Sequence, residues 1–113
     1  MAKAHPDIVR TFFLGFIRVH ILHHAAEEPI FGLEMIRELA THGYQLSPGT
    51  LYPLLHALER DRYLRTERKV VEGKVRKYYR ATRSGKTALA AALKQARKLL
   101  GEIDPAPVRK RGT

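Results

Sequence analysis

The segment at residues 47–56 has the composition of a helix start that can bind an anion. The residues of this segment that could make such contacts are Ser47, Pro48, Gly49, Thr50, Tyr52 and His56. Serine followed by proline marks a helix N-terminus, because the serine hydroxyl can accept a hydrogen bond from a free amide and proline there loses no needed donor. Free amides at such an end suit a phosphate, and the hydroxyl groups can donate to phosphates or base edges. We expect Ser47 to cap this helix and the segment to contact DNA, with half-buried packing as the alternative role for Tyr52.

Residues 64–80 form a second candidate anion-binding group. They carry seven Lys and Arg side chains against two acidic ones, a net charge of +5. A cationic arm of this kind can follow a nucleic-acid backbone or enter a minor groove. The competing interpretation is a solvated sheet edge that charge protects from aggregation. The DNA contacts expected here are Arg68, Lys69, Lys74, Arg76, Lys77 and Tyr78.

Three histidines, His20, His23 and His24, are spaced so that at least two imidazoles share one helix face. Two such rings could hold a divalent metal. No cysteine is available to help, and the nearest carboxylates along the chain are Glu27 and Glu28. We therefore expect histidines without metal, at a partly exposed position or an interface.

Motifs of catalysis are missing from the sequence. It contains no GxGxxG, GxxxxGK[ST], HExxH or GxSxG string, and it has no cysteine. Disulfides, zinc fingers and thiol catalysis are thereby excluded. We expect a protein that is not an enzyme and has no cofactor.

Charge is distributed unevenly along the 113 residues, which carry a formal net charge of +10. Residues 1–63 have a net charge of −1, and residues 81–113 add +6 to the +5 of the segment between them. The length fits one domain. Residues 1–7 lack the apolar core of a signal peptide, and the apolar stretch 12–22 is too short to span a bilayer. We expect a cytoplasmic protein without membrane contact.

Hydrophobic periodicity predicts helices at about residues 7–26, 32–42, 48–61 and 82–103. The second is expected to bury Leu33, Ile36, Leu39 and Ala40, and Gly43 follows its end, where a left-handed residue is needed. Extended segments are predicted at about 64–71 and 74–81, joined by a turn at Glu72 and Gly73, with Val70, Val75 and one of Tyr78 or Tyr79 facing inward.

This order of elements describes a mainly α fold with a small β-hairpin, the winged helix-turn-helix. We assign residues 8–81 to the winged helix-turn-helix domain. Residues 82–103 form a C-terminal dimerisation helix, and residues 104–113 form a disordered basic tail containing prolines.

Three strings resemble the signature of PadR-type transcriptional regulators: FGLEMIREL at 31–39, LSPGTLYPLL at 46–55 and RKYYRAT at 76–82, with Gly85 soon after. The resemblance implies a dimeric DNA-binding repressor, often released when a small-molecule effector binds. It looks like the compact subgroup with a short C-terminal helix. Arg62 departs from the family pattern, because a glycine usually ends the recognition helix there. The chain has no tryptophan, so the family's drug site in which that residue stacks on an aromatic drug is not expected here.

The last helix has an apolar stripe that must be buried, either on its own domain or in a two-fold dimer. The resemblance implies that the first helix assists dimerisation. The residues expected at a dimer contact are Phe12, Phe16, Leu89, Leu93, Ala96 and Leu100.

The function expected is therefore a dimeric, sequence-specific regulator of transcription that binds an inverted-repeat operator in double-stranded DNA. A non-specific nucleoid-binding protein would use the same cations. A protein–protein module on a winged-helix scaffold is the third alternative.

Overall fold

The computed structural model describes residues 4–105, so nearly all of the basic tail expected at 104–113 lies outside the described part of the chain. The long helix α1 (Ala4–Glu27) is followed by the short strand β1 (Ile30–Phe31), then by α2 (Gly32–Thr41) and α3 (Pro48–Arg60). The hairpin of β2 (Leu64–Val71) and β3 (Lys74–Ala81) leads into the last helix, α4 (Arg83–Ile103). The predicted helices and both predicted strands are confirmed.

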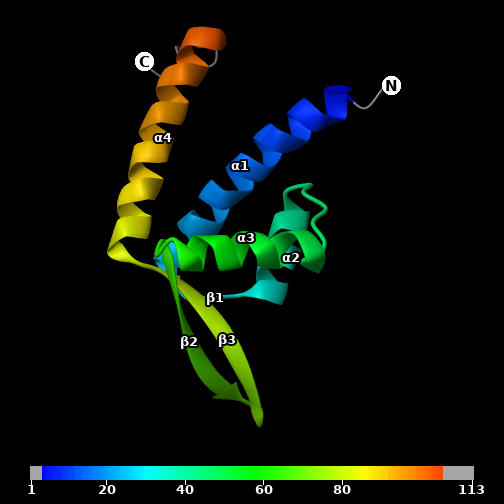
Figure 1. The fold of residues 1–113 in the computed structure, drawn as a ribbon, viewed down its shortest axis with the longest axis vertical. Coiled ribbons are helices and arrows are strands. Elements are labelled where there is room, and N and C mark those ends of the chain that lie inside the picture. The colour runs from blue at the N-terminus through cyan, green and yellow to red at the C-terminus, as the bar shows by residue number, and fades with distance from the viewer. Residues whose placement is uncertain (1–3, 106–113) are drawn as a thin grey trace.

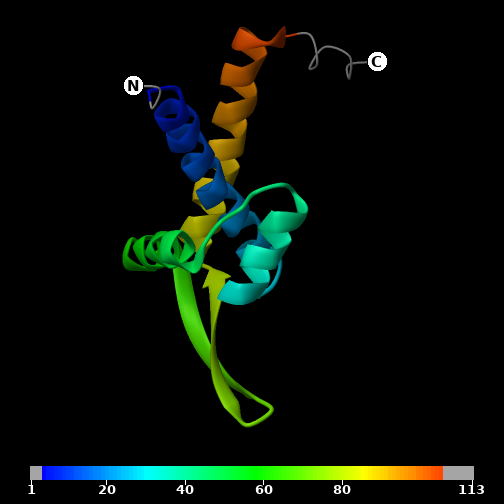
Figure 2. The same cartoon turned by 90° about the vertical axis from the view of Figure 1, so that its right-hand side faces the viewer.

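The elements form a helical body with two kinds of projection (Figure 1). Helices α1 and α4 diverge from the body on one side, and the β2–β3 hairpin extends from it on the opposite side, as a turned view also shows (Figure 2). The body is held together where α1, α2, α3 and the base of the sheet meet. The largest side chains fully buried there are Tyr79, Ile17, Ile21, Leu39, Leu51, Leu55 and Leu64.

Strand β1 was missed by the sequence prediction. It pairs antiparallel with β3, with Ile30 opposite Tyr79 and Phe31 opposite Tyr78, which makes a three-stranded sheet in the order β1-β3-β2. Two residues are too few to show an alternating pattern. The hairpin turn is confirmed: Glu72 and Gly73 both have positive φ, of 51° and 79°, as a two-residue turn matched to the strand twist requires.

The buried face of α2 differs in part from the predicted one: Leu39 is buried as expected and Ile36 packs partly against the core. Gly32, Met35 and Leu39 are buried, whereas Leu33 is 45% exposed and Ala40 is exposed. The helix is rotated because its first residue packs against the Tyr52 ring, where any side chain larger than hydrogen would collide. That contact directs the positions three and seven residues later, Met35 and Leu39, toward the core. The left-handed residue expected at Gly43 is confirmed, with φ of 86°.

Ser47 does not cap α3 with its side chain. Its backbone carbonyl accepts bonds from the amides of Thr50 and Leu51, at 3.0 and 2.9 Å, but its hydroxyl donates to the Thr50 hydroxyl at 3.3 Å. No amide of the first turn donates to the Ser47 hydroxyl oxygen, so the predicted side-chain cap is wrong. Thr82 does cap α4, since its hydroxyl oxygen accepts from the Gly85 amide at 3.0 Å.

The inward-facing valines were also predicted wrongly. Val70 is 71% exposed and Val75 is 65% exposed, while Tyr79 is buried as expected. The three share one face of the β2–β3 ladder, as the strand register requires. The hairpin extends past the body, so the core covers Tyr79 and does not reach the valines.

The wing and α4 join at a tight hydrogen-bonded corner. Arg62 has φ of 66°, the left-handed conformation that its replacement of glycine implied. Its carbonyl accepts from the hydroxyls of Thr82 and Ser84, at 2.7 and 2.9 Å, and the Tyr63 carbonyl accepts from the Thr82 amide at 3.0 Å. Gly85 is buried directly against the Tyr63 carbonyl.

Replacing Gly85 with alanine should therefore destabilise the fold. The new methyl group would collide with the Tyr63 carbonyl oxygen, a rigid backbone atom, and the corner would have to open. We expect G85A to lower the free energy of unfolding by about 2 kcal/mol in urea titration. The matched control is G101A, where a methyl group meets no atom and helix propensity improves. Equal stability of G85A and the wild type would contradict this account of the corner.

Candidate nucleic-acid interface

Helix α3 has one leucine face and one polar face. Leu51, Leu54, Leu55 and Leu58 are buried and fix the helix to the body. On the other side lies an exposed row at helical spacing, consisting of Gly49, Pro53, His56 and Arg60. Ser47 and Pro48 continue this surface at the N-terminus, and the first acidic side chain of the helix is Glu59. An uncrowded helix start without carboxylates can approach a phosphate or a base edge.

Tyr52 occupies an intermediate position. Its side chain is half-buried against Gly32 at the start of α2, and its ring centroid lies 6.2 Å from that of His56. The ring thus packs α3 against α2, as the alternative role for Tyr52 predicted. The ring also lies next to the exposed row. Arg60 was not among the expected contacts, although it follows His56 by four residues on the same row. It is exposed and lies 3.4 Å from the Asp61 carboxylate.

The expected contacts of the wing, meaning the β2–β3 hairpin, divide between two faces of the ladder. Lys69 and Arg76 lie opposite each other on one face, beside the rings of β1 and β3. The Lys69 ammonium is 5.2 Å from the centre of the Tyr78 ring, and the Arg76 guanidinium is 4.8 Å from that of Phe31. These cation–π contacts hold the two cations against the base of the wing.

The other face of the wing packs toward α3. The Lys77 ammonium lies 3.7 Å from the Glu59 carboxylate, and the Thr66 hydroxyl donates to the same carboxylate at 3.3 Å. Arg68, directly opposite Lys77, is exposed. Glu59 therefore joins the wing to the C-terminal part of α3.

Arg80 is engaged within the wing itself. Its guanidinium donates to the Glu67 carboxylate at 3.1 Å, and this hydrogen bond is the main reason that the pKa of Glu67 lies below its ordinary value. Lys69 is 3.9 Å from the same carboxylate. Among the described residues, no carboxylate lies within ion-pair distance of Arg68 or Lys74, and both side chains are exposed. Of the six wing contacts expected from the sequence, these two are the exposed cations that no carboxylate within residues 4–105 engages.

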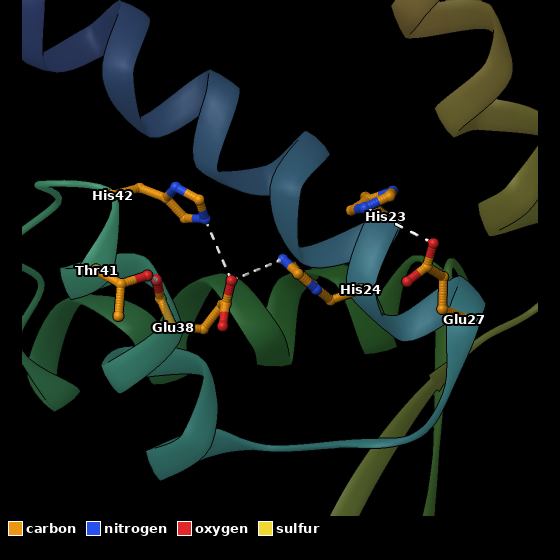
Figure 3. Close-up of polar contacts among 6 residues, drawn as sticks. All are labelled: His23, His24, Glu27, Glu38, Thr41 and His42. Carbon is orange, nitrogen blue, oxygen red and sulfur yellow. Dashed lines mark hydrogen bonds and ion pairs between the residues drawn. The ribbon is translucent and has the colours of Figure 1, made fainter.

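The histidines of α1 join a wider cluster with α2 (Figure 3). The His20 ring stacks on His24 at 5.3 Å and lies 5.4 Å from His42. The Glu38 carboxylate is 3.2 Å from Nε2 of His42 and 3.8 Å from Nε2 of His24, and His23 points away toward Glu27. Across residues 4–105, no group of three or more His, Cys, Asp or Glu side chains is arranged to hold a metal ion. The cluster ties α1 to the end of α2.

These features define a winged helix-turn-helix protein whose exposed helix start and cationic wing face outward. Comparison with known proteins agrees. The family model described as "Transcriptional regulator PadR-like family" matches residues 21–91. The chain is 45% identical over 95 residues to transcriptional regulator Rv3488 of Mycobacterium tuberculosis, covering 84% of this chain and 89% of the relative.

Solved structures give the same result. A PadR family transcriptional regulator from Eggerthella lenta is 31% identical, with a TM-score of 0.73, and the match covers 93% of this chain and 96% of that one. The protein smu.1704 of Streptococcus mutans is 30% identical, with a TM-score of 0.71 over 78% of this chain and 82% of its own. The chain belongs to the PadR-like family, and it is a DNA-binding transcriptional regulator and not an enzyme. Within the described residues, no helix has the length and apolar character to cross a bilayer.

Removing the Arg68 and Lys74 charges should weaken DNA binding in a salt-dependent way. Each lost phosphate contact makes the log–log dependence of affinity on salt shallower by about 0.9, so R68Q/K74Q should lose about 1.8. Fluorescence anisotropy at several salt concentrations measures this slope. K98Q removes an exposed cation from α4 and serves as the control. A slope that is the same in R68Q/K74Q and the wild type would show that Arg68 and Lys74 do not contact phosphates.

The histidine cluster should make stability depend on pH. Burial, together with His24, His42 and His23, lowers the pKa of His20 from its ordinary 6.5. The unfolded chain therefore binds a proton more readily than the native one just below pH 6.5, and stability falls as the pH falls. We expect unfolding in urea to need less free energy at pH 6.0 than at pH 7.5, and H20L to lessen this difference. An unchanged difference in H20L would remove His20 from the explanation.

Proposed function

We propose that two copies of this chain pair through the face formed by α1 and α4 and bind an inverted-repeat operator as a repressor. The observation that supports pairing is an uncovered apolar surface on these helices. Phe12 is 68% exposed, Leu100 56% and Ile103 81%. A small monomer rarely leaves such a surface in water, and a two-fold pair would cover it twice.

The exposed apolar side chains line a groove of about 570 Å³ between α1 and α4. Four of the six expected dimer residues line it: Phe12, Phe16, Ala96 and Leu100. Leu99 and Ile103, on the same stripe, lie beside them. Leu89 instead packs partly against the core of its own domain, and Leu93 is half-buried.

The same groove supports the proposed release by a small molecule. Its volume lies within the range of about 300–1,000 Å³ that is usual for small-molecule sites, and its lining is almost entirely apolar. An apolar effector bound there would compete with the partner copy for the apolar lining and change how the two copies are arranged. Repression would end when the altered pair no longer fits both half-sites of the operator.

Pairing can be tested by placing a charge in the groove. Leu100 is exposed in the protomer, so L100E should fold normally and yet sediment as a monomer, because a pair would bury the new carboxylate unpaired. A91E places the same charge at an exposed position that does not line the groove and should leave the pair intact. Sedimentation velocity measures both, with circular dichroism as the check on folding. A dimer that persists in L100E would place the interface elsewhere.

Sequence-specific regulation can be separated from its two alternatives by footprinting. The intergenic DNA beside the gene is the natural probe, with unrelated competitor DNA in excess. A specific regulator protects one inverted repeat under competition, whereas a nucleoid-type protein loses all protection. A protein–protein module would show no salt-dependent binding to either DNA. Either of these last two patterns would overturn the proposal.

A further inference from the structure

Val70 and Val75 form an exposed apolar pair near the tip of the wing. They lie directly opposite each other in the β2–β3 ladder and are 71% and 65% exposed. Opposed β-branched residues stabilise a hairpin through their mutual contact, which accounts for their pairing. It does not account for the apolar surface that both continue to present to water.

The pair belongs to the same face of the wing that contacts α3. Along this face the ladder places Thr66 opposite Tyr79, then Arg68 opposite Lys77, then Val70 opposite Val75. The first two of these pairs contain the groups that meet Glu59 of α3, the Thr66 hydroxyl and the Lys77 ammonium. A surface therefore runs from α3 along the wing to its tip, first polar, then cationic, then apolar.

The charge around the valines identifies the partner. On the same face, exposed Arg68 and its partner Lys77 come directly before the valines, and exposed Lys74 precedes Val75 on the opposite face. An anionic surface is therefore favoured, and that surface must also offer apolar groups. The minor groove of DNA has both properties, since phosphates line its rims and deoxyribose forms its walls, and apolar wedges are a known means of binding there. Resting on the DNA-binding function above, we propose that the Val70–Val75 pair packs against the sugar walls of a minor groove while α3 lies in the adjacent major groove. This contact supplies a part of the affinity that salt does not weaken.

The test replaces both valines with threonine, which keeps the β-branched shape and removes apolar surface. The probe is a labelled A·T-rich duplex of about 30 base pairs, and anisotropy gives affinity and salt slope. We expect V70T/V75T to bind roughly tenfold more weakly with an unchanged slope. V70I/V75I, which keeps the apolar surface, should bind as tightly as the wild type.

Two controls separate this contact from other effects. Val71 lies on the opposite face of the ladder, so V71T should bind like the wild type. Netropsin, a minor-groove ligand, should abolish the difference between the wild type and V70T/V75T when it fills the duplex first. Equal affinity of V70T/V75T and the wild type, or an equal loss in V70I/V75I, would overturn the inference alone. A wild-type protein that binds no duplex would overturn the DNA-binding function itself.

Discussion

Burial of the leucine face of α3 is the constraint from which the rest of the molecule follows. Leu51 and Leu55 are completely enclosed, and together with Leu54 and Leu58 they fix both the position and the rotation of the helix. Once that face is inside, the row through Gly49, His56 and Arg60 can only point outward. The hydrophobic effect thus orients the exposed row that we propose contacts DNA.

The Tyr52 ring and the Glu59 carboxylate extend this constraint to the neighbouring elements. The ring sets the rotation of α2 through its contact with Gly32, and the carboxylate binds the wing through Thr66 and Lys77. If α3 and the wing bind DNA as we propose, their joined geometry loses little conformational freedom on binding, which favours affinity. Membership of the PadR-like family agrees with this arrangement.

Much of this architecture could be predicted from the sequence because it rests on local patterns. Ser47–Pro48 marked the start of α3, and Glu72–Gly73 marked the wing turn. What failed depended on distant contacts. The rotation of α2 is set by Tyr52, twenty residues beyond Gly32, and the exposure of Val70 depends on where the core ends, which alternation along a strand does not reveal. The cluster around Glu38 combines side chains of α1 and α2 that only the fold brings together.

The corner at Arg62 and Thr82 has a mechanical consequence. Thr82, which precedes α4, is hydrogen-bonded to Arg62 and Tyr63, which precede β2 of the wing. Gly85 packs against the Tyr63 carbonyl and leaves no space between α4 and the wing. The helix and the hairpin project to opposite sides of this corner (Figure 1), so the same few hydrogen bonds set the directions of both. A substitution that changes the angle at which α4 leaves the corner must therefore also be accommodated at the base of the wing.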